Sequence, residues 1–239
     1  MWGPEIAEAY DATVAERFRP EDLVPTVDRL AELAGDGAAL ELAVGTGRVA
    51  LPLSERGVPV HGIELSPHMA EQLQEKPGAE QVEVTLGDMT STRVSGAFSL
   101  VYLVFNTIQN VTTQDEQVAI FANAAAHLEP AGRFVVEVGV PQPEELRMGE
   151  QGYVFEMTDD HVGIDTYEGP VTQISRSHHW WKIDGRQVRH RAPYRYLWPS
   201  EMDLMAKLAG LQLEDRSAGW RAEPFTNEST TQVAVYRKP

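Results

Sequence analysis

Residues 39–53, ALELAVGTGRVALPL, join an apolar strand to two glycines and then to a helical pattern. Gly45, Gly47 and Ala50 fit the glycine fingerprint of the turn that opens a dinucleotide-binding βαβ unit. Glu41 lies within the strand, four residues before Gly45. A carboxylate is unfavourable beside a pyrophosphate, but favourable beside a cofactor that carries ammonium and sulfonium charges. Glu41 could instead hold the glycine loop through backbone N–H groups.

Short apolar runs alternate with helical segments around this turn. The expected strands are residues 38–44, 58–65, 82–88, 98–105 and 133–139, with helical spacing between them, as in 115–128. Strands that are apolar at nearly every position are buried on both faces, as in a parallel sheet covered by helices. The pattern predicts a doubly wound α/β fold whose ligand lies beyond the carboxyl ends of the strands.

The segments on either side of these runs complete the predicted domain. Residues 5–34 have helical spacing that Pro20 and Pro25 interrupt, which predicts two or three short helices. Near the carboxyl end, Ser200 and Asp203 suit a helix N-cap and its N3 partner. Two further strands are expected at 211–216 and 232–236.

An antiparallel insertion is predicted between residues 141 and 198. Asp184-Gly185 between two strand-like runs is typical of a two-residue type I′ hairpin turn. That register sets Trp181 opposite Val188 and His179 opposite His190. One face then carries Ile183, Trp181, His179, Val188, His190, Ala192, Tyr194 and Tyr196. The other face carries Arg176, His178, Trp180, Lys182, Arg189, Arg191 and Arg195.

The whole chain is therefore interpreted as a single domain in four parts. These parts are an N-terminal helical cover (1–37), a cofactor-binding core (38–140), the antiparallel β insertion or lid (141–198) and the end of the core (199–239).

Composition and charge narrow the class of partner. The 239 residues carry a formal net charge of −16, which disfavours nucleic acid because affinity for phosphates comes largely from Lys and Arg. No apolar run approaches the ~20 residues of a membrane span, and the acidic N-terminus does not fit a signal peptide. The absence of cysteine excludes thiolate metal sites and fits a reducing compartment. We expect a cytoplasmic protein that binds neither nucleic acid nor membrane.

Two carboxylates beyond the glycine turn suit an adenosyl group. Glu64 ends the second expected strand, 17 residues after Gly47, where a carboxylate can accept hydrogen bonds from both ribose hydroxyls. Asp88 follows the third strand in Gly87-Asp88-Met89, where it can accept the adenine amino group while Met89 packs on the ring. A solvated carboxylate at Glu64 and an ordinary turn at Asp88 are the alternatives.

Taken together, these residues resemble the class I S-adenosylmethionine (SAM)-dependent methyltransferases. Residues 41–47, ELAVGTG, resemble the first family motif, with Ala43 in place of the commoner glycine. Residues 62–69, GIELSPHM, resemble the second motif, and 87–89 the third. Ser99 stands where the fourth strand often has an Asp, and 128–133 resemble the turn into the fifth strand.

The resemblance implies a Rossmann-like sheet of seven strands, the last antiparallel, with SAM as cofactor. It implies that Glu64 binds the ribose, Asp88 and Met89 the adenine, and the backbone near Leu103 part of the methionine. Tyr10 resembles a tyrosine that some members place near the SAM carboxylate, although a core role is the alternative. The full set expected to bind the cofactor is Tyr10, Glu41, Ala43, Gly45, Gly47, Glu64, Leu65, Met69, Asp88, Met89 and Leu103.

The acceptor is expected to be a small molecule methylated on nitrogen or oxygen, such as a specialised metabolite or sugar. Its expected contacts are Phe105, Asn106, Gln109, Asn110, Trp181 and Tyr194. His179 and His190 are candidate general bases, since an imidazole of pKa near ~6.5 can take a proton. No cluster of metal ligands has credible spacing.

Several alternatives stay open at this stage. The insertion could pack one face on a helix and leave the other solvated or paired with the acidic body, or it could join two subunits as a homodimer. An NAD(P)-dependent oxidoreductase is compatible with the glycine fingerprint, although no Tyr-x-x-x-Lys pair is present. A non-methylating SAM-binding enzyme on the same fold is the other alternative.

Overall fold

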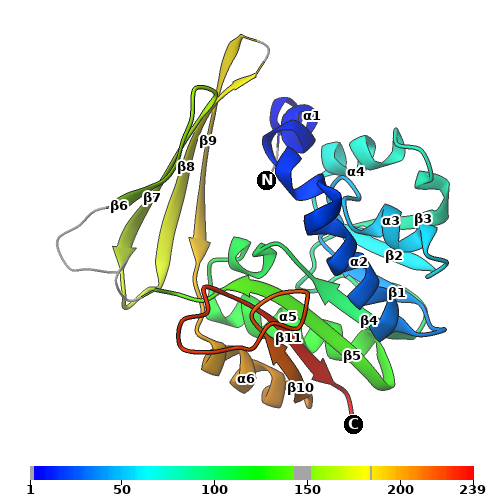
Figure 1. Cartoon of the computed structure of the whole chain (residues 1–239). Coiled ribbons are helices and arrows are strands. Elements are labelled where there is room, and N and C mark those ends of the chain that lie inside the picture. Colours follow the sequence, from blue (N-terminus) through cyan, green and yellow to red (C-terminus); the bar gives the residue numbers. More distant parts are fainter. Residues whose placement is uncertain (1–2, 143–151, 184) are drawn as a thin grey trace.

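A seven-stranded sheet in the order β10-β11-β5-β4-β1-β2-β3 forms the centre of the computed structural model, which describes residues 3–142, 152–183 and 185–239 (Figure 1). Its strands are β1 (Ala39–Leu42), β2 (Val60–Glu64), β3 (Val82–Leu86), β4 (Phe98–Leu103), β5 (Leu128–Gly139), β10 (Gln212–Ser217) and β11 (Thr231–Arg237). β1, β2, β3, β4 and β5 pair in parallel, whereas β11 is antiparallel to β5. The predicted doubly wound sheet, with its last strand antiparallel, is confirmed.

Helices cover both faces of the sheet because the strands are apolar on both sides. The helices are α1 (Pro4–Thr13), α2 (Pro20–Ala34), α3 (Ala50–Glu55), α4 (Pro67–Gln74), α5 (Gln114–His127) and α6 (Pro199–Leu208), with short 3-10 turns η1 (Ala15–Phe18), η2 (Ala79–Gln81) and η3 (Thr107–Asn110). Leu30 of α2, Leu53 of α3 and Leu73 of α4 belong to one buried cluster. Phe121 of α5 and Met202 of α6 belong to the cluster on the other face.

Pro25 does not break the N-terminal helical region, contrary to the sequence prediction, because it lies inside α2. Proline lacks the N–H that would bond the carbonyl four residues earlier. That carbonyl, of Glu21, instead accepts a hydrogen bond from the Arg221 guanidinium at 2.6 Å. A contact from a distant part of the chain thus offsets the local defect. Pro20 does mark a boundary, since α2 begins there.

The helix α6 begins earlier than predicted. Its N-cap is Trp198, and Pro199 occupies the first helical position, where a missing N–H costs nothing. Glu201 is the N3 residue, and its carboxylate accepts the Trp198 N–H at 2.9 Å. The prediction of Ser200 as N-cap with Asp203 as N3 was wrong.

A separate antiparallel sheet, here called the arm, stands beside the main sheet (Figure 1). It consists of β6 (Gly152–Met157), β7 (His161–Gly169), β8 (Ile174–Ile183) and β9 (Arg186–Arg195), and lies in the chain between β5 and α6. The predicted register is confirmed, with Trp181 opposite Val188 and His179 opposite His190. Asp184 of the predicted turn lies outside the described residues, whereas Gly185 has the positive φ, 75°, that a type I′ turn requires.

The base of the arm is fixed by Arg195, which the sequence interpretation had placed on an open basic face. Its guanidinium is buried and donates to Glu201 at 3.0 Å, to Gln173 at 2.8 Å and to Gln117 of α5. The alternation of β9 does put Arg195 on that side of the arm, but at this end of the strand that side faces α5 and α6.

No helix among the described residues is long and apolar enough to cross a membrane.

Candidate cofactor and acceptor site

The glycine turn after β1 carries three residues with positive φ: Ala43 at 56°, Gly45 at 58° and Gly47 at 80°. This conformation leaves the backbone N–H of Gly45 directed at Glu64, whose carboxylate accepts it at 2.8 Å. Close approach of β2 also requires Gly62, because a Cβ there would lie 2.6 Å from Val44 side-chain atoms. The turn is therefore fixed by local conformation and by its fit against β2.

Glu41 is buried in the middle of the sheet and hydrogen-bonded to the strand beside it. The Tyr102 hydroxyl of β4 donates to its carboxylate at 2.9 Å, and a second bond comes from the backbone of Ala50, where α3 begins. Burial raises the pKa of Glu41 to about 8, against the opposing effect of the Tyr102 hydrogen bond. The carboxylate that holds Gly45 of the turn is thus Glu64, and Glu41 instead bonds the first residue of the following helix.

Glu64 closes β2 and is bonded at both oxygens. The second oxygen accepts the backbone N–H of Ser66 at 2.8 Å, and burial raises the pKa of the carboxyl in spite of these bonds. Ser66 caps α4 by accepting the N–H of Met69, whose side chain reaches to 3.5 Å from the Cβ position of Gly45. The second motif therefore packs directly on the first.

The N-terminal helix is tied to the same turn. Asp11 accepts the Thr46 hydroxyl at 2.6 Å and forms an ion pair with Lys76, which also donates to the Thr46 carbonyl at 2.8 Å. Tyr10, one residue earlier, has a pKa raised by burial, with Glu64 and Glu41 among the nearby charges. The helix thus places the Tyr10 phenol within electrostatic range of the two carboxylates.

The other residues expected to bind the cofactor follow neighbouring strands at the same edge. Leu65 after β2 is 49% exposed, although it is a large apolar residue. Asp88 after β3 is exposed and accepts both the backbone N–H and the hydroxyl of Thr90, at 2.8 and 2.7 Å. Met89 and Leu103 are buried. An apolar side chain and a carboxylate therefore stand open where an adenine would lie.

The donor set fits SAM better than a dinucleotide. Glu41 and Glu64 are buried carboxylates whose pKa values are raised by burial, so a nearby positive ligand would stabilise their charged forms. A pyrophosphate at the glycine turn would oppose both charges. The residues present thus favour a cofactor with cationic groups.

A strained turn links this edge to the second half of the site. Phe105 and Asn106, after β4, have φ values of 58° and 60°, which non-glycine residues rarely adopt. Glu137 of β5 stabilises the turn by accepting the Phe105 N–H at 2.8 Å and the Trp220 indole N–H at 2.9 Å. The Asn106 amide oxygen accepts the Gly139 N–H at 2.6 Å. Such strain is concentrated at functional sites.

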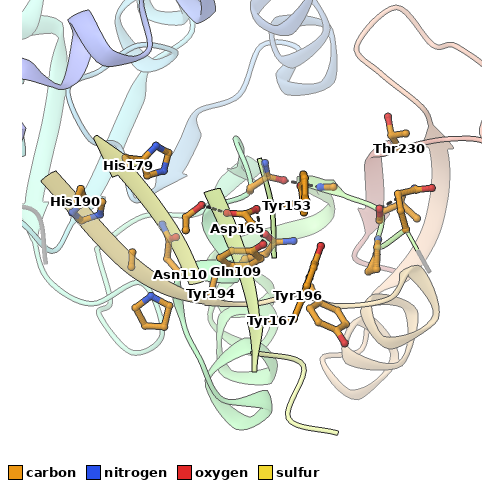
Figure 2. Close-up of a pocket in the computed structure, with 18 residues that line it drawn as sticks. Gln109, Asn110, Tyr153, Asp165, Tyr167, His179, His190, Tyr194, Tyr196 and Thr230 are labelled. Carbon is orange, nitrogen blue, oxygen red and sulfur yellow. Dashed lines mark hydrogen bonds between the residues drawn. The ribbon is translucent and has the colours of Figure 1, made fainter. Parts of the chain in front are cut away.

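A cavity of about 420 Å³ lies between this turn and the inner face of the arm (Figure 2). Its lining comprises Asn106, Gln109, Asn110, Gly139, Val140, Pro141, Gln142, Tyr153, Asp165, Tyr167, Ser177, His179, His190, Ala192, Pro193, Tyr194, Tyr196 and Thr230. Figure 2 shows His179 and His190 toward one end, Thr230 toward the other and Asp165 between them. The cavity is thus lined by the carboxyl edge of the main sheet and by all four strands of the arm.

Asp165 of β7 is the buried acid of this cavity, with 9% of its surface exposed. Its carboxylate accepts the hydroxyl of Tyr194 at 2.8 Å and that of Ser177 on the adjacent strand. Burial raises the pKa of Asp165, although the bonds from Ser177 and Tyr194 act in the opposite direction. No sequence motif marked this residue, which is one polar position in an alternating strand.

The two candidate bases lie in a stack of rings on the inner face of the arm. His179 is 2.9 Å from His161 between ring nitrogens, and its ring stacks on Trp181 with centroids 4.5 Å apart. Burial, together with the neighbouring His161 and His190, lowers the pKa of His179 to about 4. Burial also lowers the pKa of His190. These imidazoles are neutral near pH 7, and His179 is a weak base.

The expected acceptor contacts fall into two groups. Asn106, Gln109, Asn110 and Tyr194 line the cavity, together with both candidate bases. Phe105 and Trp181 do not line it: the Phe105 ring lies 5.0 Å from the Arg48 guanidinium, and Trp181 is buried in the ring stack. Phe105 has a positive φ, which strand alternation alone does not predict.

Two further residues of the site were missed. Glu137 lies within an apolar strand as Glu41 does, so the same signal was available in the sequence. Asp165 and its partner Ser177 offered no comparable signal, because β6 and β7 were not assigned individually.

Comparisons with known proteins agree with this geometry. Residues 39–132 match the family model described as a methyltransferase domain. The structure of the CcbJ methyltransferase from Streptomyces caelestis matches with a TM-score of 0.87 and 34% identity, covering 99% of this chain and 97% of that chain. The cypemycin N-terminal methyltransferase of a Streptomyces species is 24% identical over 236 residues, 97% of this chain and 95% of the relative.

A third relative is the dTDP-3-amino-3,4,6-trideoxy-alpha-D-glucopyranose N,N-dimethyltransferase of Streptomyces venezuelae. It is 32% identical over 142 residues, 57% of this chain and 58% of the relative. The chain belongs to the class I SAM-dependent methyltransferases. It is an enzyme whose cofactor is SAM, and the NAD alternative is set aside.

Proposed function

We propose that this enzyme transfers the methyl group of SAM to a nitrogen atom of a small molecule bound in the cavity beneath the arm. The main observation in support is the position of that cavity. Two of its lining residues, Asn106 and Gly139, lie at the carboxyl edge of the main sheet, where the cofactor is expected. Its volume of about 420 Å³ lies in the range of small-molecule sites. The names of two relatives, an N-terminal methyltransferase and an N,N-dimethyltransferase, support nitrogen as the acceptor.

The proposed cofactor residues are those that gather at the carboxyl ends of β1 to β4. Glu64 would accept the ribose hydroxyls, Asp88 and Met89 would contact the adenine with Leu65 beside it, and Glu41 would face the cationic groups. Tyr10, Met69, Leu103 and the turn at Ala43, Gly45 and Gly47 would enclose the methionine part. SAM, when bound, supplies an electrophilic methyl group on a sulfonium centre.

The arm would act as the cover of the acceptor, and the four-part division of the chain made from the sequence is retained as a proposal. Asn106, Gln109, Asn110 and Tyr194 would orient the acceptor, since an aligned nucleophile is a large part of the catalysis of a displacement. His179 and His190 would shape the same wall. A reducing, cytoplasmic location is consistent with a chain that contains no cysteine.

Calorimetric titration tests the cofactor half of the proposal. We expect wild-type protein to bind SAM and its demethylated product, and not NAD.

Glu64→Ala should weaken SAM binding at least tenfold, because hydrogen bonds to a charged acceptor contribute ~1.5–3 kcal/mol each. It should also lower stability, since the Gly45 and Ser66 N–H groups lose their acceptor. Glu75→Ala, an exposed residue after α4, is the matched control. Unchanged SAM affinity in folded Glu64→Ala would remove Glu64 from the site.

A homodimer is the proposed assembly, formed through the outer face of the arm. That face carries Arg176, Lys182, Arg189 and Arg191, whereas the whole chain has a net charge of −16. A basic patch on an acidic protein complements the body of a second copy. Sedimentation should show a dimer at low salt that dissociates in 0.5 M salt or in Arg189→Glu/Arg191→Glu. A monomer under all conditions would contradict the proposal.

A further inference from the structure

We propose that Asp165 is the counter-ion for a protonated amine of the acceptor, so that the enzyme selects small cationic amines. The bound ammonium passes its proton to the Asp165 carboxylate, and the neutral nitrogen then attacks the methyl group of SAM, with S-adenosylhomocysteine as the leaving group. This proposal rests on the function proposed above and names the substrate class of the same cavity. The observations behind it are the partners of the carboxylate, the charges around it and the rings that enclose it.

The three side-chain hydrogen bonds identified to Asp165 all come from neutral hydroxyl groups. The hydroxyls of Ser177 and Tyr194 donate to its two oxygens, and Tyr153 contributes a further side-chain hydrogen bond. Hydroxyl donors offset only part of the cost of burying a carboxylate, which is usually compensated by an opposite charge. An incoming cation would supply that charge.

No lysine or arginine in the described ranges forms an ion pair with Asp165. Arg176, on the strand beside it, pairs with Glu168 instead. His178 acts to lower the pKa of Asp165, but burial lowers the pKa of His178 itself, and its side chain is bonded to Thr166, 3.0 Å away. Thr166 and His178 are each one position removed from the pair Asp165 and Ser177, so they lie on the outer face. In the part of the chain that the structure describes, the inner side of the carboxylate therefore faces the cavity without a lysine or arginine paired to it.

Aromatic rings complete the proposed amine site. Tyr153, Tyr167 and Tyr194 all line the cavity, and the rings of Tyr153 and Tyr167 stack with centroids 6.2 Å apart (Figure 2). Cations are attracted to the faces of such rings, and the Asp165 carboxylate in the same cavity lining adds direct charge recognition. A hydroxyl acceptor of the same size would gain neither interaction.

The test uses a matched pair of probes, cyclohexylammonium and cyclohexanol, titrated into the full-length protein saturated with S-adenosylhomocysteine and followed by NMR. We expect the ammonium probe to bind wild-type protein at least tenfold more tightly than the alcohol. Asp165→Asn should remove that preference. Asp159→Asn, the same change at an exposed position of the arm, should retain it.

Tyr194→Phe tests whether the charge of Asp165, and not one of its hydroxyl donors, determines binding of the ammonium probe. It removes one donor to Asp165 but keeps the carboxylate, so ammonium binding should stay within threefold of wild type. Equal binding of the ammonium probe by wild type and Asp165→Asn would overturn the proposal, as would equal binding of the two probes by wild type. Calorimetry of SAM and transfer of labelled methyl to amines are measured separately. Their failure would count against the proposed function, not against the amine site alone.

Discussion

Burial acts on a carboxyl at the centre of the cofactor-binding core and on a stack of imidazoles in the arm, and it shifts the pKa values of these two kinds of group in opposite directions. In the core, burial raises the pKa of Glu41 to about 8. In the arm, burial lowers the pKa values of His161 and His190, and that of His179 to about 4. In both regions burial favours the neutral form, but the neutral form is protonated in one case and deprotonated in the other.

The two regions also differ in the sequence separation between their proposed site residues. The glycine turn, Glu64 and Met69 are close in sequence and are fixed by the ends of adjacent strands. The cavity instead combines η3, the end of β5, all four strands of the arm and Thr230. The comparison suggests that the donor site depends mainly on backbone conformation, whereas the acceptor site depends on side chains that strand pairing brings together.

Gly45→Val should have the largest effect and is confined to the core. A branched side chain at a φ of 58° strains the turn and projects where the cofactor should approach. We expect SAM affinity to fall more than 100-fold, with a modest drop in melting temperature. Gly57→Val is the matched control, because Gly57 also has a positive φ, 86°, and no atom within 4 Å of its Cβ position. Retained affinity in Gly45→Val would show that the turn has only a structural role.

The opposite pKa shifts predict opposite pH sensitivities. Glu41, with a raised pKa, stabilises the fold below its usual range near 4.5, and this contribution is lost as pH rises through about 8. For a buried group the loss is on the order of 5 kcal/mol, given about 1.4 kcal/mol per pKa unit and a shift from 4.5 to about 8. The lowered pKa of His179 gives stability that is present above 6.5 and lost as pH falls toward about 4.

Hydrogen exchange, corrected for intrinsic rates, should therefore show β1 and β4 losing protection at pH 9, and β7, β8 and β9 losing it at pH 5. Glu41→Gln should remove the first change and leave the second. Parallel loss of protection in both regions at both extremes of pH would contradict the comparison.

His179→Ala and His190→Ala should have smaller effects, confined to the arm. A base typically contributes ~10²- to 10⁴-fold, but His179, with a pKa of about 4, is too weak a base for a full contribution. We expect turnover to fall less than tenfold, with the pH profile between 6 and 8 and the SAM affinity unchanged. His178→Ala, on the outer face, should be nearly silent. A wild-type inflection near pH 6.5 that disappears in His179→Ala would restore the general-base interpretation.

Ala43→Gly should have the smallest effect, and it should raise the free energy of unfolding instead of lowering it. Ala43 has a φ of 56°, a conformation that costs a non-glycine residue ~1–2 kcal/mol. Glycine removes that strain but adds ~0.4–1 kcal/mol of entropy to the unfolded chain. We therefore expect a gain of about 0.5 kcal/mol in denaturant unfolding. A clear loss of stability would indicate that the methyl group of Ala43 makes a packing contribution that outweighs the strain.

The sequence alone was sufficient for the main sheet, the order of motifs and the hairpin register. Each depends on short-range signals: apolar runs, glycines at a turn and an Asp-Gly pair with a period of two on either side. Glu41, Glu64 and Asp88 could be proposed as cofactor residues because they stand at the ends or in the middle of such runs.

Only the tertiary structure decided where the remaining groups act. Pro25 stays inside α2 because Arg221, 196 positions later, bonds the carbonyl that proline leaves open. Arg195 is buried because one end of β9 meets α5 and α6, and Phe105 has a positive φ and does not line the cavity. The weak basicity of His179 and the position of Asp165 depend on burial by neighbouring strands. Desolvation is a property of the surrounding packing, and local sequence carries no direct measure of it.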